Sequence, residues 1–141
     1  MPGYDQSSYV VYLSRVPMFS TCTPEQLAYV AALAEERDAQ PGEEIVREGD
    51  GGSEFFVIAT GTARVSRRGE EVANLGAGDY FGELALLDPA PRDATVTAST
   101  PSNLLVMSRD AFTAALDGVP ELRDAMLHGL ARRIHELGAR Y

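Results

Sequence analysis

With 141 residues, of which 45% are hydrophobic, the chain can bury one ordinary core and is too short for two domains of typical size. Its 21 acidic residues outnumber its 12 basic ones, and the net charge of -9 would repel nucleic acid and anionic membranes. A single cysteine, the lack of a secretory signal pattern and the lack of a long apolar run predict a cytoplasmic protein with no internal disulfide and no membrane span. The basic residues are all arginine, which suggests a GC-rich genome and a bacterial source.

The N-terminal part of the chain has helical spacing. Between residues 7 and 36, apolar residues recur at steps of three and four, which predicts helices. Thr23, Pro24 and Gln26 offer a capping hydroxyl, a proline at the first helical position and a capping-box amide. We therefore expect the second helix to begin here, and we place the N-terminal helices within residues 1–37.

The middle of the chain, residues 38–107, has the pattern of a β-sheet protein. Short apolar or alternating runs are separated by glycines, which suit turns that need positive φ. Many short strands at such spacing are typical of a sandwich, a jelly roll or a barrel. The expected strands are residues 43–46, 55–58, 62–65, 71–75, 95–98 and 104–107.

Helical spacing returns in residues 108–141. Ser108 can cap a helix that runs to about Leu116, and Pro120 opens a longer helix that ends near Gly138. No internal repeat and no linker divides the sequence. The expected organisation is therefore one domain over residues 1–141, mainly β with flanking helices.

Residues 81–96 carry the chemistry. Gly82 opens a short helical turn, whose unpaired N–H groups and partial positive charge suit a phosphate. Arg92 follows a proline-constrained loop and could reach the same phosphate with its planar fork of donors. Glu83 only accepts hydrogen bonds, and a neutral ribose hydroxyl is the obvious donor to it. On these residues alone, an equally good interpretation is that Glu83 caps the helix and Arg92 pairs with it.

This segment resembles the phosphate-binding cassette of cyclic-nucleotide-binding domains, which occur in protein kinase A regulatory subunits, cyclic-nucleotide-gated channels and bacterial catabolite activators. Residues 45–61 resemble the first barrel signature of the same family, in which glycines mark turns and an apolar run forms a buried strand. The resemblance covers about residues 19–137. It implies a jelly-roll-like β-barrel with N-terminal helices, a short phosphate-cassette helix and a C-terminal lid helix.

The resemblance also implies roles for individual residues. The ligand would be cAMP, with cGMP as the second candidate, bound without catalysis and without a cofactor. Arg92 would pair with the cyclic phosphate and Glu83 would accept the ribose 2′-hydroxyl. The backbone N–H groups expected to line the phosphate are those of Gly82, Leu84, Ala85 and Ala94. The residues within reach of the base on the lid helix are Arg132, Arg133, Ile134 and Leu137.

One position departs from the family pattern. The residue after the cassette arginine is usually Ser, Thr, Ala or Gln, and here it is Asp93. Its carboxylate could lie near the phosphate and weaken binding, or it could orient Arg92. Two unit charges about 6 Å apart in a partly wet site change affinity by about tenfold or more.

The sequence also disfavours other function classes. A metal enzyme is disfavoured because His128 and His135 lie in the last helix and the strand region has no histidine. Cys22 has no histidine near it in sequence and is expected to be passive. Because the chain stops at Tyr141 without a helix-turn-helix, direct DNA binding is disfavoured as well.

The most favoured function is a regulatory module that binds a cyclic nucleotide and passes the bound state through its helices to a protein effector. A homodimer through the C-terminal helix is one option for its assembly. Two alternatives are a degenerate fold that serves as an interaction module without ligand, which Asp93 supports, and a fragment of a larger transcription regulator or enzyme.

Overall fold

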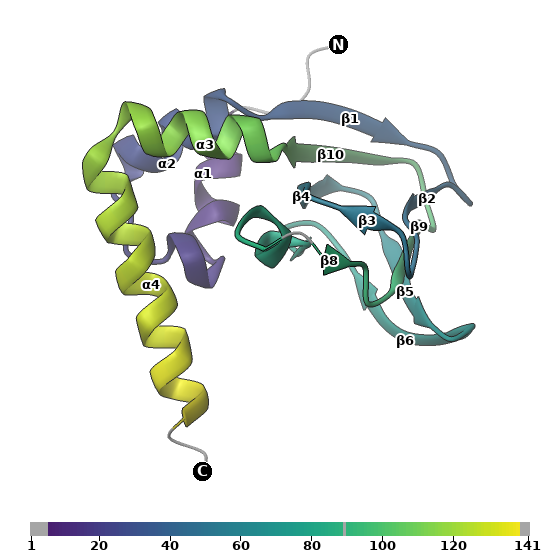
Figure 1. The fold of residues 1–141 in the computed structure, drawn as a ribbon. Coiled ribbons are helices and arrows are strands. Elements are labelled where there is room, and N and C mark those ends of the chain that lie inside the picture. The colour runs from purple at the N-terminus through teal and green to yellow at the C-terminus, as the bar shows by residue number, and fades with distance from the viewer. Residues whose placement is uncertain (1–5, 89, 139–141) are drawn as a thin grey trace.

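Helices gather at one end of the molecule and strands at the other (Figure 1). The computed structural model describes the backbone of residues 6–88 and 90–138, and the side chains of residues 8–88 and 90–132. The helices before the strands are α1 (Gln6–Ser14), the 3-10 turn η1 (Pro17–Phe19) and α2 (Pro24–Ala32). Those after the strands are α3 (Arg109–Gly118) and α4 (Pro120–Gly138).

Local capping signals begin the helices where the sequence predicts. Thr23 accepts a hydrogen bond from the Gln26 N–H at 3.1 Å, and the Gln26 side chain accepts one from the Thr23 N–H at 2.9 Å. Ser108 caps α3 by accepting from the N–H of Ala111 at 3.1 Å. The predicted starts of α2 and α3 are therefore confirmed, because both depend on residues within one turn.

The strands form two four-stranded antiparallel sheets. The first has the order β1 (Glu35–Ala39), β10 (Ser102–Met107), β4 (Phe55–Thr60), β7 (Tyr80–Phe81). The second has the order β2 (Glu44–Val46), β9 (Thr95–Ala98), β5 (Ala63–Arg67), β6 (Glu70–Leu75). A further pair, β3 (Gly51–Gly52) with β8 (Ala90–Pro91), is a ladder of two residues.

These sheets are open, whereas the sequence led us to expect a barrel. The β3–β8 pair forms a separate ladder, and no strand pairing joins the two four-stranded sheets into one closed cylinder in the described part of the chain. The mainly β, jelly-roll-like fold with flanking helices is confirmed.

Strand β4 is buried on both faces and links two apolar cores. Phe55 and Val57 pack with the helices in one core, whereas Phe56 and Ile58 face the second sheet in the other. The first sheet thus lies between the helices and the second sheet.

The prediction of helix to about Glu36 is wrong. Helix α2 ends at Ala32, and Glu35–Ala39 form β1, which pairs along its length with β10. The sequence of this edge strand, EERDA, has no alternation of apolar and polar residues, and only its last residue, Ala39, is buried. Pairing with a distant strand decided the structure here, against the local pattern.

Candidate functional site

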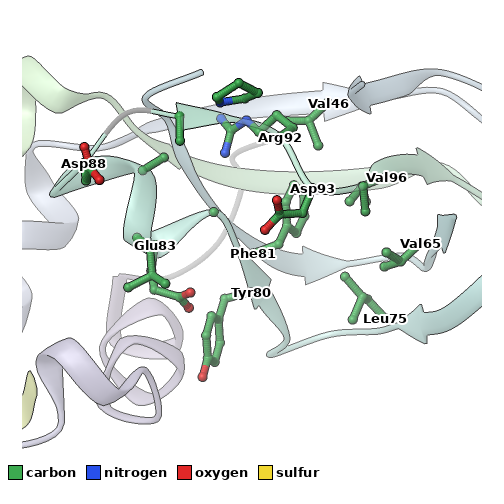
Figure 2. A pocket seen from close by; sticks show the side chains of 16 residues that line it. Val46, Val65, Leu75, Tyr80, Phe81, Glu83, Asp88, Arg92, Asp93 and Val96 are labelled. Atoms are coloured by element: carbon green, nitrogen blue, oxygen red, sulfur yellow. The ribbon is translucent and has the colours of Figure 1, made fainter. Parts of the chain in front are cut away.

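A cavity of about 360 Å³ lies between the second sheet and the segment that follows β7 (Figure 2). Every candidate residue that the sequence singled out as ligand-binding contributes to its wall: Gly82, Glu83, Leu84, Ala85, Arg92, Asp93 and Ala94. These residues come from one stretch of chain that leaves β7, turns through η2 (Glu83–Leu86) and returns through β8.

Gly82 makes the turn that begins this segment. Its φ of 83° is in the left-handed region, which glycine adopts without a Cβ penalty. Leu86 is buried and holds η2 to the core, whereas Leu84 is exposed. The Ala85 N–H, one of the expected phosphate donors, donates to the Gly82 carbonyl at 3.1 Å, so a phosphate would have to compete with this bond.

Arg92 lies in the cavity wall as a half-buried cation. Its Nη2 donates to the backbone carbonyl of Glu54 at 2.9 Å, and its Cζ lies 5.9 Å from the centre of the buried Phe56 ring. Burial lowers the pKa of Arg92, and the Glu54 carboxylate partly opposes that effect. Guanidinium nevertheless stays protonated in proteins, so the cavity wall carries a fixed positive charge.

No carboxylate among the described residues lies close enough to Arg92 to form an ion pair with it. The Glu54 side chain pairs instead with Arg37 at 3.2 Å. The ion pairs of the described residues do not include one between Arg92 and Glu83, so the structure does not support the alternative in which Arg92 merely pairs with Glu83. Figure 2 shows the two side chains on opposite sides of the cavity, with Glu83 directed toward Tyr80.

Asp93 also faces the cavity. Its backbone carbonyl accepts from Arg67 Nε at 3.2 Å, which anchors the chain just after Arg92. The Asp93 carboxylate is exposed, and the Arg92 guanidinium points away from it (Figure 2). The structure pairs no carboxylate with Arg92 within its described part, so Asp93 does not orient the arginine here.

The other half of the cavity is apolar, and our sequence reasoning did not identify its residues. Its wall includes Val46, Val65, Leu75 and Val96, contributed by β2, β5, β6 and β9. Apolar walls of this kind suit a flat ring system. The available signal was the alternation along each strand, but which alternate face lines a cavity depends on how the two sheets pack.

Helix α4 contributes no residue to the cavity wall in the described part of the chain. It packs against η1 instead and runs away from the sheets (Figure 1). A Cβ on Gly129 would lie 2.4 Å from the Pro17 carbonyl oxygen, which shows how closely helix and turn approach. Of the expected base-capping residues, Arg132 is exposed. The side chains of Arg133, Ile134 and Leu137 lie outside the described residues.

His128 and Cys22 do not line the cavity. His128 is exposed, and the side chain of His135 lies outside the described residues. Burial raises the pKa of the Cys22 thiol to about 11, which makes it a poor nucleophile at neutral pH. No three His, Cys, Asp or Glu side chains in the described ranges come together as a metal site, and no described helix is long and apolar enough to cross a membrane.

Comparisons with known proteins all indicate one protein family. The profile of the cyclic nucleotide-binding domain matches residues 36–118. The cAMP-dependent protein kinase regulatory subunit of Hypocrea atroviridis is 34% identical over 132 residues, which are 94% of this chain and 27% of that protein. The protein of the same name from Mycosarcoma maydis is 41% identical over 117 residues, which are 77% of this chain and 22% of that protein. The chain thus spans about a quarter of the length of these curated relatives.

Solved structures agree. The N-terminal domain of a transcriptional regulator from Streptomyces coelicolor A3(2) is similar with a TM-score of 0.84 and 33% identity, over 89% of this chain and 94% of that one. A structure described as Sp-2Cl-cAMPS bound to PKAR CBD2 is similar with a TM-score of 0.67 and 29% identity, over 94% of this chain and 91% of that one. Fungal and bacterial proteins both occur among these relatives, so the bacterial source stays a prediction.

Proposed function

Because the chain belongs to the cyclic nucleotide-binding domain family, we propose that its cavity binds a cyclic mononucleotide, with cAMP preferred to cGMP, and that it does so without catalysis or a cofactor. The observation that carries this proposal is the Arg92 guanidinium, half-buried in the cavity wall with no carboxylate partner among the described residues. A half-buried charge that forms no ion pair is costly to desolvate, and an anionic ligand bound to it would offset that cost.

The rest of the cavity suits the remaining parts of such a ligand. One guanidinium matches the single negative charge of a cyclic phosphodiester. Glu83, across the cavity from Arg92, offers acceptors to ribose hydroxyls, and the apolar walls offer contact to a base. A volume of about 360 Å³ is at the small end of ligand cavities and favours a mononucleotide over a larger dinucleotide.

We propose further that the domain is a sensor that acts on a protein effector. Helix α4 lies away from the cavity in this structure, so a ligand that contacts it better in a closed arrangement would shift its population toward closure. The effector would then read the position of α4. Nucleic acid and membranes are not the proposed partners, because the net charge is -9.

A second candidate is an interaction module that binds no nucleotide. The observation in its favour is the Asp93 carboxylate, which faces the cavity in which a phosphate would lie. Its repulsion would weaken every cyclic nucleotide alike.

A thermal melt separates the two candidates. The protein is unfolded, freed of nucleotide by dialysis and refolded, and its melting temperature is then measured with cAMP, cGMP, a cyclic dinucleotide and 5′-AMP. At 100 times its Kd, a ligand specific for the folded state adds about 2.7 kcal/mol, which for a domain of this size is about 8 °C. We expect the largest shift with cAMP. No shift at millimolar cAMP would favour the interaction module.

A further inference from the structure

Two glycines from different parts of the chain enclose the Arg92 guanidinium. Gly52 lies in β3 and is paired with Ala90 in β8, two residues before Arg92. The backbone around Arg92 is held by two hydrogen bonds, from the Arg92 N–H to the Asp50 carbonyl at 2.8 Å and from the Gly49 N–H to the Arg92 carbonyl at 2.9 Å. The β3 segment is therefore fixed directly beside the arginine.

The Arg92 guanidinium fits between Gly52 and Gly82 only because neither residue has a side chain. A Cβ on Gly52 would lie 2.3 Å from Arg92 Nε, 2.6 Å from Nη2 and 2.7 Å from Cζ. A Cβ on Gly82 would lie 2.7 Å from Nη1. Carbon and nitrogen atoms do not approach so closely without bonding, so a methyl group at either place would displace the guanidinium.

We infer that Gly52 is a positioning residue: its missing side chain leaves the space in which the Arg92 guanidinium is held at the cavity wall. One consequence of this inference rests on the proposed function. Nucleotide affinity should depend on Gly52, although Gly52 does not line the cavity. Gly52 instead lines a neighbouring hollow of about 290 Å³, which shares Arg92 with the cavity. The Glu54 carbonyl and the Phe56 ring complete the enclosure.

Gly52 is better suited to a test than Gly82. Gly82 has a φ of 83° and lies close to the Glu54 carbonyl, so substitution there would strain the backbone as well. Gly52 is not among the positive-φ glycines, and the atoms that a Cβ would meet belong to the flexible end of a side chain. Gly52→Ala should therefore move Arg92 while leaving the fold intact.

The adjacent Gly51 provides a matched control. It lies in the same strand, has no positive φ, and a Cβ there would meet no atom within 4 Å. Gly51→Ala thus makes the same chemical change without touching Arg92.

The first experiment needs no nucleotide. In the 15N spectrum of the nucleotide-free protein, the Nε–Hε signal of Arg92 is assigned by its loss in Arg92→Lys. We expect this group to be as rigid as the backbone in the wild type, whereas that of the exposed Arg64 is mobile. Its chemical shift should change in Gly52→Ala and stay in place in Gly51→Ala. A mobile Arg92 side chain in the wild type would overturn the inference. So would a change in the Arg92 chemical shift that is equally large in Gly52→Ala and Gly51→Ala, or absent from both.

The second experiment measures cAMP affinity by calorimetry. We expect Gly52→Ala to bind about tenfold more weakly and Gly51→Ala to bind within about twofold of wild type. In an Arg92→Lys background, whose side chain lacks the planar fork, Gly52→Ala should cost much less. Equal losses in both backgrounds would show that Gly52 acts otherwise. If the wild type binds no cAMP while the spectra behave as expected, the proposed function fails and the positioning of Arg92 by Gly52 stands.

Discussion

Comparison of Arg92→Ala with Glu83→Ala should separate the contribution of the phosphate to cAMP affinity from that of the ribose. In the nucleotide-free protein, one of the five N–H donors of Arg92 is bound to the Glu54 carbonyl. The other donors can form a two-pronged contact with a phosphate. Arg92→Ala would leave the phosphate of a bound nucleotide in a half-buried site without its counter-charge, whereas Glu83→Ala would remove hydrogen bonds between the carboxylate and neutral hydroxyls.

The two losses should therefore differ in size. For Arg92→Ala we expect about 2–4 kcal/mol of cAMP binding free energy, or about 30- to 1,000-fold in Kd. For Glu83→Ala we expect about 1–2 kcal/mol, or about 5- to 30-fold. Both are measured by calorimetry on protein freed of nucleotide.

Two controls make the comparison interpretable. Arg64→Ala removes the same charge from an exposed position of β5 beside the cavity-lining Val65, and should leave Kd within about twofold. In the nucleotide-free state, Arg92→Ala loses one hydrogen bond but also removes an unpaired, half-buried cation. We expect its melting temperature to change by no more than about 4 °C. Equal affinity losses for Arg92→Ala and Glu83→Ala would refute the reasoning, because the phosphate would then be held mainly by backbone amides.

Three further outcomes are expected. Asp93→Thr should strengthen the binding of both nucleotides by removing a repulsive charge, and that of cGMP more, since a neutral hydroxyl can meet the guanine amino group; titrations at two salt concentrations measure this, and weaker binding of both would contradict it. A DNA fragment should not be retained by micromolar protein in a gel-shift assay even at about 50 mM salt, and a salt-dependent shift would contradict the absence of a nucleic-acid partner. The Cys22 thiol, with its pKa raised from 9.0 to about 11, should be alkylated about 100-fold more slowly at pH 8 than an unperturbed thiol, because the thiolate reacts. Its rate should keep rising with pH up to about 11, and a plateau near pH 9 would show that Cys22 is not desolvated.

Features that depend on neighbouring residues could be predicted from the sequence. The capping box at Thr23, the cap at Ser108 and the short helical turn that Gly82 opens each involve interactions within a few positions. The same holds for the part of the cavity wall that residues 82–94 contribute, since they form one continuous segment and all the candidates in it line one cavity. Such local patterns have few competing conformations, so residue type alone decides among them.

Other features were decided by contacts between distant segments. The polar stretch Glu35–Ala39 is a strand because β10 pairs with it, and the apolar half of the cavity exists because four strands present one face each. The position of the Arg92 guanidinium depends on Gly52, forty residues earlier, and on the Glu54 carbonyl. No local pattern encodes these contacts, because the energy that selects them comes from tertiary pairing and packing. The sequence thus identified the continuous segment that forms one side of the candidate site, whereas the tertiary structure alone decided which strand residues form the other side and how Arg92 is held.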